Sequence, residues 1–241
     1  MSGFCKVEKE FIVRHKFYKP QKATYGFVGK KAPLLAYEYL QDHTESREKI
    51  LAAFGDRYRD ISVLRQVHGD KCIVVDCLED VHRENYADAQ VTKNKNILLG
   101  IQTADCVPIL FIDEVNEVIG AAHAGWRGAI AGVINSTVNK MSSLGSVASS
   151  MDVIIGPCIR QESYEVGEDF YNKFLNETKE NKRFFIAGNS PDKYMFDLSG
   201  YVKTKSGKLL IFSFMNNHFR IPSSEIRETM YTTLKNIYEN Y

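Results

Sequence analysis

Three residues in this sequence carry side chains that could do chemistry together. They are His68, Cys106 and His123, and each stands at the end of an apolar run beside small residues. Two imidazoles and a thiolate provide three zinc ligands and leave a fourth position open, which is the pattern of a catalytic zinc site. Zinc in such a site lowers the pKa of a bound water towards neutrality. Because sulfur with imidazole also suits copper, the ligand types leave the metal open between zinc and copper.

The same side chains allow a chemistry that needs no metal. Cys106 would then be a nucleophile and His123 its base, as in a cysteine hydrolase or deamidase. A structural role is the third interpretation, because a single buried cysteine commonly serves as a small core residue. Separations of about 38 and about 17 residues match no short metal motif. From spacing alone, the structural role is favoured.

Two aspartates and an arginine near these residues are further candidates. Asp105 and Asp88 are candidate general bases or hydrogen-bond partners of the histidines. For Asp88 the sequence alone favours a turn-forming role. Arg127 follows Trp126 at an expected strand-to-helix junction, where backbone N–H groups and a guanidinium could hold phosphate or carboxylate. An ordinary turn with Trp126 packed as a lid is equally compatible with this segment.

A hairpin is the element expected to position Cys106 and His123. The apolar runs 109–112 and 118–122 have the length of strands, and the polar segment 113–117 between them is typical of a turn. This places Cys106 at the start of one strand and His123 at the end of its neighbour. In an antiparallel pair these two positions lie side by side.

The remaining pattern mixes strands and helices without strict alternation, which predicts an α+β or mixed α/β class and one domain over residues 1–241. The expected strands are 61–67, followed at a hairpin distance by 72–76, then 89–92, 97–103, 153–155 and 209–214. The expected helices are 36–54, 130–141 (ended by Gly145), a helix from about Glu168, 197–203 and 223–241. Segment 79–88 is an expected exposed loop, and 164–167 either lines a pocket or, as the sequence favours, enters a helix.

The composition argues against several classes of partner. The 241 residues contain 31 basic and 30 acidic side chains. This balance lacks the excess of positive charge expected of a protein that binds nucleic acid or an anionic membrane. The sequence contains no apolar run of the roughly 18 residues that a membrane span needs, and its N-terminus does not resemble a signal peptide. Five cysteines without a framework spacing predict a reducing, cytoplasmic setting. The oligomeric state is left open.

Five ordered motifs match one known family. They are Gln66-Val67-His68-Gly69, Ala87-Asp88-Ala89 with Thr92, Gly100-Ile101-Gln102-Thr103-Ala104-Asp105-Cys106-Val107-Pro108, His123-Ala124-Gly125-Trp126-Arg127-Gly128 and Ile155-Gly156-Pro157-Cys158-Ile159. Together they closely resemble the YfiH-like family, whose members are also called laccase-domain or multicopper polyphenol oxidase proteins. The resemblance is clearest over residues 61–203.

The resemblance implies a zinc centre held by His68, Cys106 and His123, with copper as the other possible metal. It implies purine nucleoside and phosphate as partners, in phosphorolysis of adenosine, inosine, guanosine or methylthioadenosine, with adenosine deamination as a second activity. The catalytic candidates are Asp105, Asp88, Arg127 and Cys106, and the candidates for substrate binding are Gln66, Arg127 and Cys158. The implied fold is a layered α/β/β/α arrangement with mixed sheets. A related fold occurs in the cytotoxic-necrotizing-factor toxins, where a cysteine and a histidine form a hydrolase pair.

The two ends of the chain depart from the family pattern. The region 17–39 lacks a clear Thr-Arg-x-Gly-Gly-like loop, and segments 212–215 and 218–220 poorly replace a Ser-Tyr-Arg-Arg element. A non-catalytic nucleoside-binding protein is therefore one alternative, beside the metal-free Cys106/His123 hydrolase. A copper-dependent polyphenol oxidase is a further alternative that ranks low, because only six histidines are present. Four of them lie outside the motifs, at His15, His43, His82 and His218.

Overall fold

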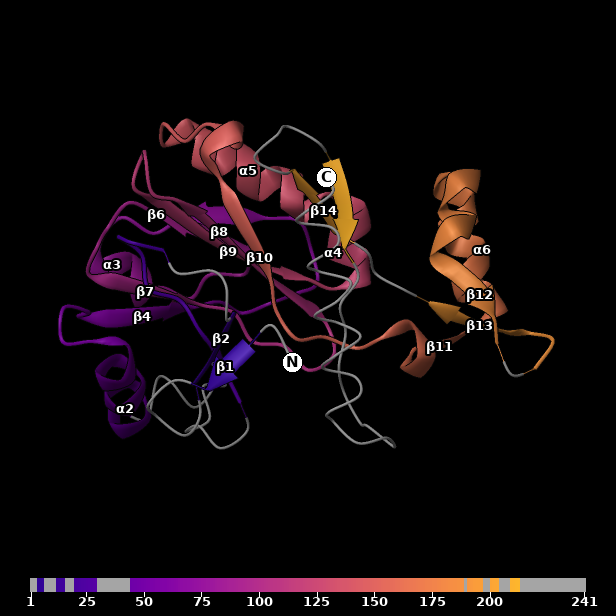
Figure 1. Cartoon of the computed structure of the whole chain (residues 1–241), viewed down its shortest axis with the longest axis horizontal. Coiled ribbons are helices and arrows are strands. Elements are labelled where there is room, and N and C mark those ends of the chain that lie inside the picture. The colour runs from indigo at the N-terminus through magenta and orange to yellow at the C-terminus, as the bar shows by residue number, and fades with distance from the viewer. Residues whose placement is uncertain are drawn as a thin grey trace.

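The structure is a computed structural model that describes most of the chain in seven segments. They are residues 4–6, 12–15, 20–29, 44–188, 190–196, 200–203 and 209–212. The described part contains mixed sheets with helices packed on them, which confirms the expected α+β class (Figure 1). No helix in these segments is long and apolar enough to cross a membrane.

A five-stranded mixed sheet forms the centre of the fold. Its strand order is β10 (Asp152–Ile155), β8 (Val107–Asp113), β9 (Val118–Ala124), β6 (Ala89–Thr92) and β5 (Cys72–Val74). The β5–β6 pair is parallel and the other pairs are antiparallel. Helix α5 (Val133–Ser143) covers one face, where Val133 and Met141 are fully buried against the apolar side chains of the sheet. Burial of this apolar face away from water stabilises the central sheet and α5 against each other.

A second, smaller sheet lies on the other face. Strands β4 (Asp60–Val63) and β7 (Ile97–Gly100) pair in parallel, and α2 (Thr44–Phe54) packs on them through Ile50. The fully buried Gln90 of β6 joins the two sheets, since its amide donates to the carbonyls of Ser62 at 3.0 Å and Gly100 at 2.9 Å. The layer order is therefore α5, central sheet, β4–β7 and α2, as expected for an α/β/β/α arrangement (Figure 1).

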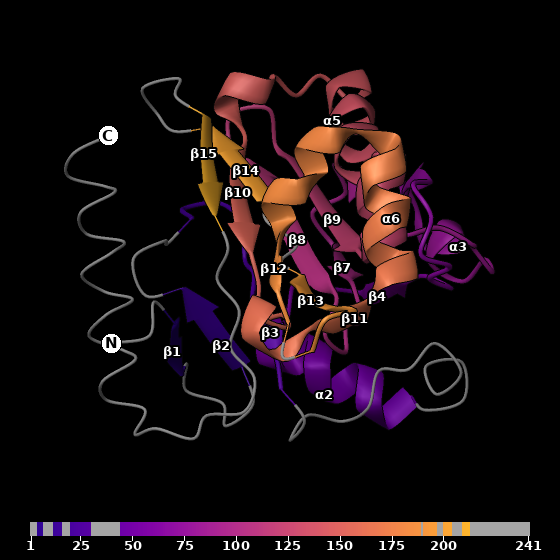
Figure 2. The ribbon, with the colours of Figure 1, turned by 90° about the vertical axis from the view of Figure 1, so that its right-hand side faces the viewer.

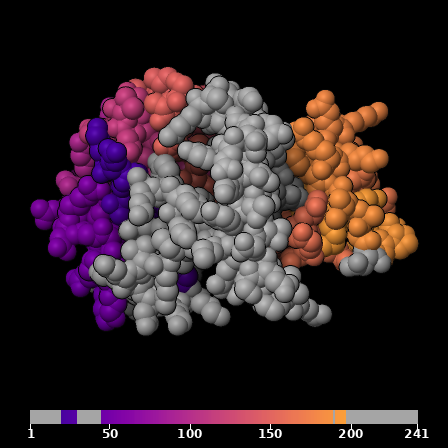
Figure 3. Space-filling view, in the orientation of Figure 1, coloured from indigo at the N-terminus to yellow at the C-terminus, as the bar shows by residue number. Residues whose placement is uncertain are grey.

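Residues 161–196 form a separate group of elements that we call the aromatic lobe. It contains 3-10 turns at Gln161–Ser163 and Lys179–Phe184, helix α6 (Glu168–Glu177), and a sheet of order β11 (Glu165–Gly167), β13 (Lys193–Phe196) and β12 (Phe185–Ala187). Its core consists mainly of aromatic side chains, of which Phe174, Phe185 and Phe196 are buried. The lobe stands beside the central sheet, at the right of Figure 1 and facing the viewer in Figure 2, and it forms the orange mass in Figure 3.

Short strands complete the described part. Strands β1 (Phe4–Lys6), β2 (Ile12–His15) and β3 (Phe27–Val28) form one antiparallel sheet, and β14 (Gly200–Lys203) pairs with β15 (Leu209–Phe212). The strand expected near 209–214 is thereby confirmed over its described residues. The helix expected over 197–203 is wrong, because residues 200–203 pair as a strand. The expected helix 223–241 lies outside the described residues.

Three further expectations need correction. Segments 61–67 and 72–76 do not pair with each other, because β4 pairs with β7 and β5 pairs with β6, both in parallel. The expected helix 130–141 is two helices, α4 (Trp126–Ala131) and α5, separated by Gly132 at φ +100°, which is a glycine conformation. The segment expected to be a loop over 79–88 contains one helical turn, α3 (Leu78–Val81).

Candidate metal centre

The β8–β9 hairpin positions Cys106 and His123 as expected. In the register of the pair, Pro108 lies opposite His123 and Val107 opposite Ala124, so Cys106 immediately precedes the paired residues. His123 is 2% exposed, whereas Cys106 is half-buried. The regular antiparallel ladder therefore brings the thiol and the imidazole to the same end of the central sheet.

His68 completes the group from a different element. It lies in the loop between β4 and β5, with its backbone in the left-handed region at φ +61°. Its Nε2 is 3.8 Å from Cys106 Sγ, and its ring meets the His123 ring edge-to-face at 4.7 Å between centroids. One ligand atom from each of the three residues lies within 4.8 Å of the others. Ligand atoms around tetrahedral zinc are about 3.3 to 3.8 Å apart, so a small closure would complete the site.

Asp88 fixes two of these ligands through one buried carboxylate. It is fully buried and accepts a hydrogen bond at 2.8 Å from Nδ1 of His123. It also accepts from the backbone N–H groups of Val67 at 3.1 Å, His68 at 2.8 Å and Gly69 at 2.7 Å. With Nδ1 of His123 held in this way, Nε2 remains for a metal. Of the three roles considered for Asp88, this geometry favours the partner of a histidine over the general base and over a turn-forming residue alone.

The electrostatics of the site suit a cation. Burial lowers the pKa of His123 against the opposing effect of Asp88, which favours the neutral imidazole that metals bind. Burial, followed by the negative charges of Asp105 and Asp88, raises the pKa of the Cys106 thiol. Without a cation the thiol therefore stays protonated, whereas a bound metal would favour the thiolate. The donor set and its surroundings fit zinc or copper.

Two glycines allow the backbone to approach the centre. A Cβ on Gly125 would lie 2.7 Å from Cδ2 of His68 and 3.3 Å from Sγ of Cys106. A Cβ on Gly128 would lie 2.5 Å from the carbonyl oxygen of Gly69. A Cβ at 2.7 Å or 2.5 Å from a neighbouring atom is closer than packed side chains tolerate. The start of α4 therefore packs directly on the His68 loop only if these two positions are glycine.

Arg127, Asp105 and Tyr164 are three further polar residues close to the centre in the sequence or in their electrostatic effects. Arg127 is exposed, and its guanidinium carbon lies 4.4 Å from the centre of the Trp126 ring. Asp105 is exposed and has φ +77°. Burial raises the pKa of the Tyr164 phenol, and the charges of Cys106 and Asp105 add to this while that of Arg127 opposes it. Tyr164 therefore lies within electrostatic range of Cys106, Asp105 and Arg127. The segment that follows it enters helix α6 as the sequence favoured, because β11 ends at Gly167 and α6 begins at Glu168.

Two residues expected to bind substrate have structural partners. The Gln66 amide donates to the carbonyl of Gln102 at 2.8 Å, and its oxygen accepts from the N–H of Gln102 at 2.8 Å. This pair of bonds ties the His68 loop to the segment that leads to Cys106. Cys158 is 2% exposed and belongs to the core under α5. Their contact with substrate stays a prediction.

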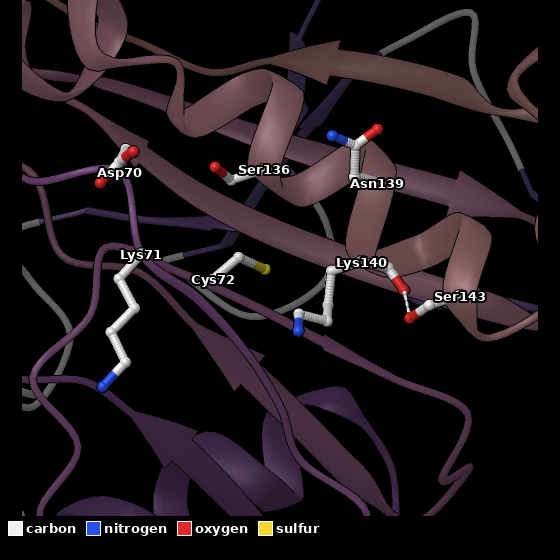
Figure 4. Close-up of a pocket in the computed structure, with 7 residues that line it drawn as sticks. All are labelled: Asp70, Lys71, Cys72, Ser136, Asn139, Lys140 and Ser143. Carbon is white, nitrogen blue, oxygen red and sulfur yellow. Dashed lines mark hydrogen bonds between the residues drawn. The ribbon is translucent and has the colours of Figure 1, made fainter.

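A surface pocket of about 480 Å³ lies next to the His68 loop but contains none of the expected site residues. Figure 4 shows its lining, which comes from the segment after His68 and from α5, with the Cys72 sulfur turned towards Lys140. The lining residues are Asp70, Lys71, Cys72, Ser136, Asn139, Lys140 and Ser143. Burial raises the pKa of Cys72 to about 11, so this thiol is a poor nucleophile.

Comparison with known proteins gives one family and a consistent set of relatives. Residues 40–211 match the family model described as multi-copper polyphenol oxidoreductase laccase. The chain is 38% identical to a purine nucleoside phosphorylase of Rickettsia prowazekii, over 70% of this chain and 72% of that protein. It is 40% identical to a purine nucleoside phosphorylase of Rickettsia conorii, over 67% of this chain but only 65% of that protein. A protein named adenosine deaminase RL5, from an unknown prokaryotic organism, is 30% identical over 54% of this chain.

Two solved structures share the fold. The Bacillus licheniformis hypothetical protein YfiH gives a TM-score of 0.66 at 24% identity, covering 81% of this chain and 80% of that one. YlmD from Geobacillus stearothermophilus gives a TM-score of 0.60 at 22% identity, covering 82% and 80%. At this level of identity the comparisons support the layered arrangement and say nothing of activity.

Proposed function

This chain belongs to the family of multi-copper polyphenol oxidoreductase laccase proteins, which includes the YfiH-like proteins, and on that premise we propose that it is a zinc-dependent purine nucleoside enzyme. The proposed reaction is phosphorolysis of adenosine, inosine, guanosine or methylthioadenosine, with deamination of adenosine as a second activity. The names of the relatives support both reactions. The observation that carries the proposal is the group of His68, Cys106 and His123, with its ligand atoms within 4.8 Å and His123 oriented by Asp88.

The three ligands and Asp88 have defined tasks in this proposal. His68, Cys106 and His123 would hold zinc, which when bound supplies a Lewis acid beside the reacting bond. Asp88 keeps the His123 ring in one tautomer and fixes the backbone of the His68 loop. The carboxylate of Asp88 already accepts four hydrogen bonds, so it is poorly suited to take a proton from a substrate.

The exposed residues around the centre would handle substrate. In phosphorolysis, a phosphate oxygen bonds to the sugar carbon while the carbon–nitrogen bond to the purine breaks and its electron pair leaves with the base. Arg127 would hold the phosphate through its planar fork. Asp105 is exposed and contributes to the raised pKa of Tyr164 and of Cys106. It would accept a proton from solvent and pass it to the departing purine.

The alternatives have less support. A metal-free hydrolase needs a thiolate at Cys106, yet the pKa of this thiol is raised, and the imidazole nitrogen within 3.8 Å of it belongs to His68 rather than His123. A multicopper oxidase needs several copper sites, and among the described residues these three form one group that could hold a metal. A binding protein without turnover would use the same centre, so only an assay distinguishes it.

Metal content and inosine turnover, measured on the same preparations, test the proposal. Mass spectrometry should find near-stoichiometric zinc in the wild type and in Cys77→Ala, a matched control at an exposed cysteine. Cys106→Ala should lose both zinc and activity. Hypoxanthine release from inosine should require phosphate.

Two outcomes would contradict it. An active protein without metal would support the Cys106 hydrolase. A zinc-loaded protein that turns over none of the four nucleosides would support the binding protein.

A further inference from the structure

Trp126 connects the metal centre to the aromatic lobe. It is the first residue of α4 and follows Gly125, where an added Cβ would lie 2.7 Å from Cδ2 of His68 and 3.3 Å from Sγ of Cys106. Its ring packs against Phe170 at 4.8 Å and Phe174 at 5.7 Å between ring centres, both on α6. Trp126, the single tryptophan of the chain, is therefore a point at which the two regions meet.

Two cations lie over this one ring. The guanidinium carbon of Arg127 is 4.4 Å from its centre, and Nζ of Lys173, on α6, is 5.1 Å from it. Both residues are exposed. Each cation is attracted to the ring face, but two like charges gathered at one ring repel each other. The arrangement would be relieved by an anion that both can reach.

The described residues provide no such anion. Neither Arg127 nor Lys173 forms an ion pair within 4.0 Å with any acidic side chain in the described segments. Lys173 has acidic residues one turn away on either side, Asp169 and Glu177, yet it lies over Trp126 instead. By contrast, Lys49 on α2 does pair with Glu45 one turn away. Among the residues described, the two cations at Trp126 are thus not directly paired with a carboxylate.

We propose that Lys173 and Arg127 together bind a phosphate dianion next to the Trp126 ring, beside the metal centre. This rests on the proposed function in taking phosphate as a substrate, and it adds a binding residue from the aromatic lobe. Arg127 supplies a planar fork and Lys173 a point charge, so the two side chains can share one dianion. The dianion is either inorganic phosphate or the phosphate group of the sugar phosphate product.

Binding can be measured without turnover, because the Trp126 ring contacts both cations and should report an anion by its fluorescence. Inorganic phosphate and ribose 1-phosphate are titrated separately into the zinc-loaded protein, with calorimetry as a second readout. Lys173→Ala should weaken binding of inorganic phosphate about tenfold. Lys173→Arg should restore most of it. Lys179→Ala, which removes an exposed lysine from the same lobe, should bind like the wild type.

In turnover, Lys173→Ala should raise KM for phosphate with little change in kcat, and its zinc content should equal that of the wild type. If only ribose 1-phosphate binds in a Lys173-dependent way, the subsite serves the sugar phosphate. Phosphate binding by Lys173→Ala that equals that of Lys179→Ala would overturn the inference. Lys173-dependent phosphate binding without hypoxanthine release would instead overturn the proposed function and leave the subsite standing.

Discussion

The two ends of the β8–β9 hairpin are each organised by a buried aspartate that holds a neighbouring loop. At the metal end, Asp88 accepts from three backbone N–H groups of the His68 loop and from His123 Nδ1. At the turn end, Asp113 accepts from the N–H and side-chain amide of Asn116 and from the hydroxyls of Ser146 and Ser150. Asp88 is fully buried and Asp113 is 1% exposed.

The two networks differ in whether one of the donors belongs to the metal centre. The donors to Asp88 include an imidazole whose other nitrogen faces the metal centre, whereas no donor to Asp113 belongs to the site. A buried aspartate that accepts hydrogen bonds from a neighbouring loop can therefore stabilise the fold alone, or stabilise the fold and also orient a residue of the metal centre. Substitutions at the two aspartates should separate these contributions.

The largest expected effect is that of Asp88→Asn. The amide cannot accept all the hydrogen bonds of the carboxylate, so both His68 and His123 lose their orientation. We expect zinc affinity to fall about 10- to 100-fold and the free energy of unfolding to fall by about 2 to 4 kcal/mol. Competition with a chelator measures the first and denaturant unfolding of the metal-free protein the second. Wild-type zinc affinity in this variant would refute the role given to Asp88.

Gly125→Ala should damage the metal end by crowding. The new Cβ would lie 2.7 Å from the His68 ring, so the ring or α4 must shift, which costs about 1 to 3 kcal/mol of stability and several-fold in zinc affinity. Gly167→Ala is the matched control, since its Cβ would meet no atom within 4 Å. Its stability should change by less than about 1 kcal/mol. Equal zinc affinity in the two variants would argue against the close approach.

Asp113→Asn should affect stability without affecting the centre. We expect the free energy of unfolding to fall by about 1 to 3 kcal/mol at neutral pH, with zinc affinity and activity unchanged. A loss of zinc comparable with that of Asp88→Asn would remove the distinction between the two ends of the hairpin.

The pH dependence of the same variant has a definite sign. Burial acts to raise the pKa of Asp113, but hydrogen bonds from Ser146 and Ser150 outweigh it and hold the pKa well below its usual range. A carboxyl with a depressed pKa in the folded state stabilises the fold fully above its unfolded pKa of about 3.9 and loses this contribution as the pH falls. The stability difference between wild type and Asp113→Asn should therefore shrink between about pH 5 and pH 3. A difference that stays constant over this range would contradict the assigned network.

The smallest expected effect is that of Gln66→Ala. It removes two hydrogen bonds to the backbone of Gln102 that join the His68 loop to the Cys106 segment. Stability should fall by about 1 kcal/mol, and zinc affinity should fall less than in Gly125→Ala, because the ligands themselves are not displaced. A rise in KM for inosine with no change in stability would instead support the expected substrate contact of Gln66.

The elements that the sequence predicts well are local. The hairpin that presents Cys106 and His123 follows from two apolar runs around a polar turn, both within one short segment. Pairing of β4 with β7 and of β5 with β6 joins segments separated by other elements, so residue periodicity cannot choose between these partners and a hairpin. Gly132 indicated the break between α4 and α5, since its positive φ ends the first helix. The helical spacing of the apolar residues around it nevertheless favoured one continuous helix.

The candidate metal ligands could be named from the sequence, but the residues that hold them in place could not. Spacing alone favoured a structural role for each, and only the ordered family motifs indicated a common site. The role of Asp88 depends on donors about 20 residues before it and on His123 about 35 residues after it. The partnership of Lys173 with Trp126 depends on the packing of the aromatic lobe. No local sequence pattern predicts the contacts of Asp88 or the contact between Lys173 and Trp126.

A cobalt titration tests most directly the claim that these residues form a metal centre. Cobalt(II) replaces zinc and gives a thiolate charge-transfer absorption when cysteine is a ligand. We expect this band at one equivalent in the wild type, retained in Cys77→Ser and absent in Cys106→Ser, with weaker binding in Asp88→Asn than in Asp113→Asn. A wild-type spectrum without the band, or a band that survives Cys106→Ser, would contradict the account.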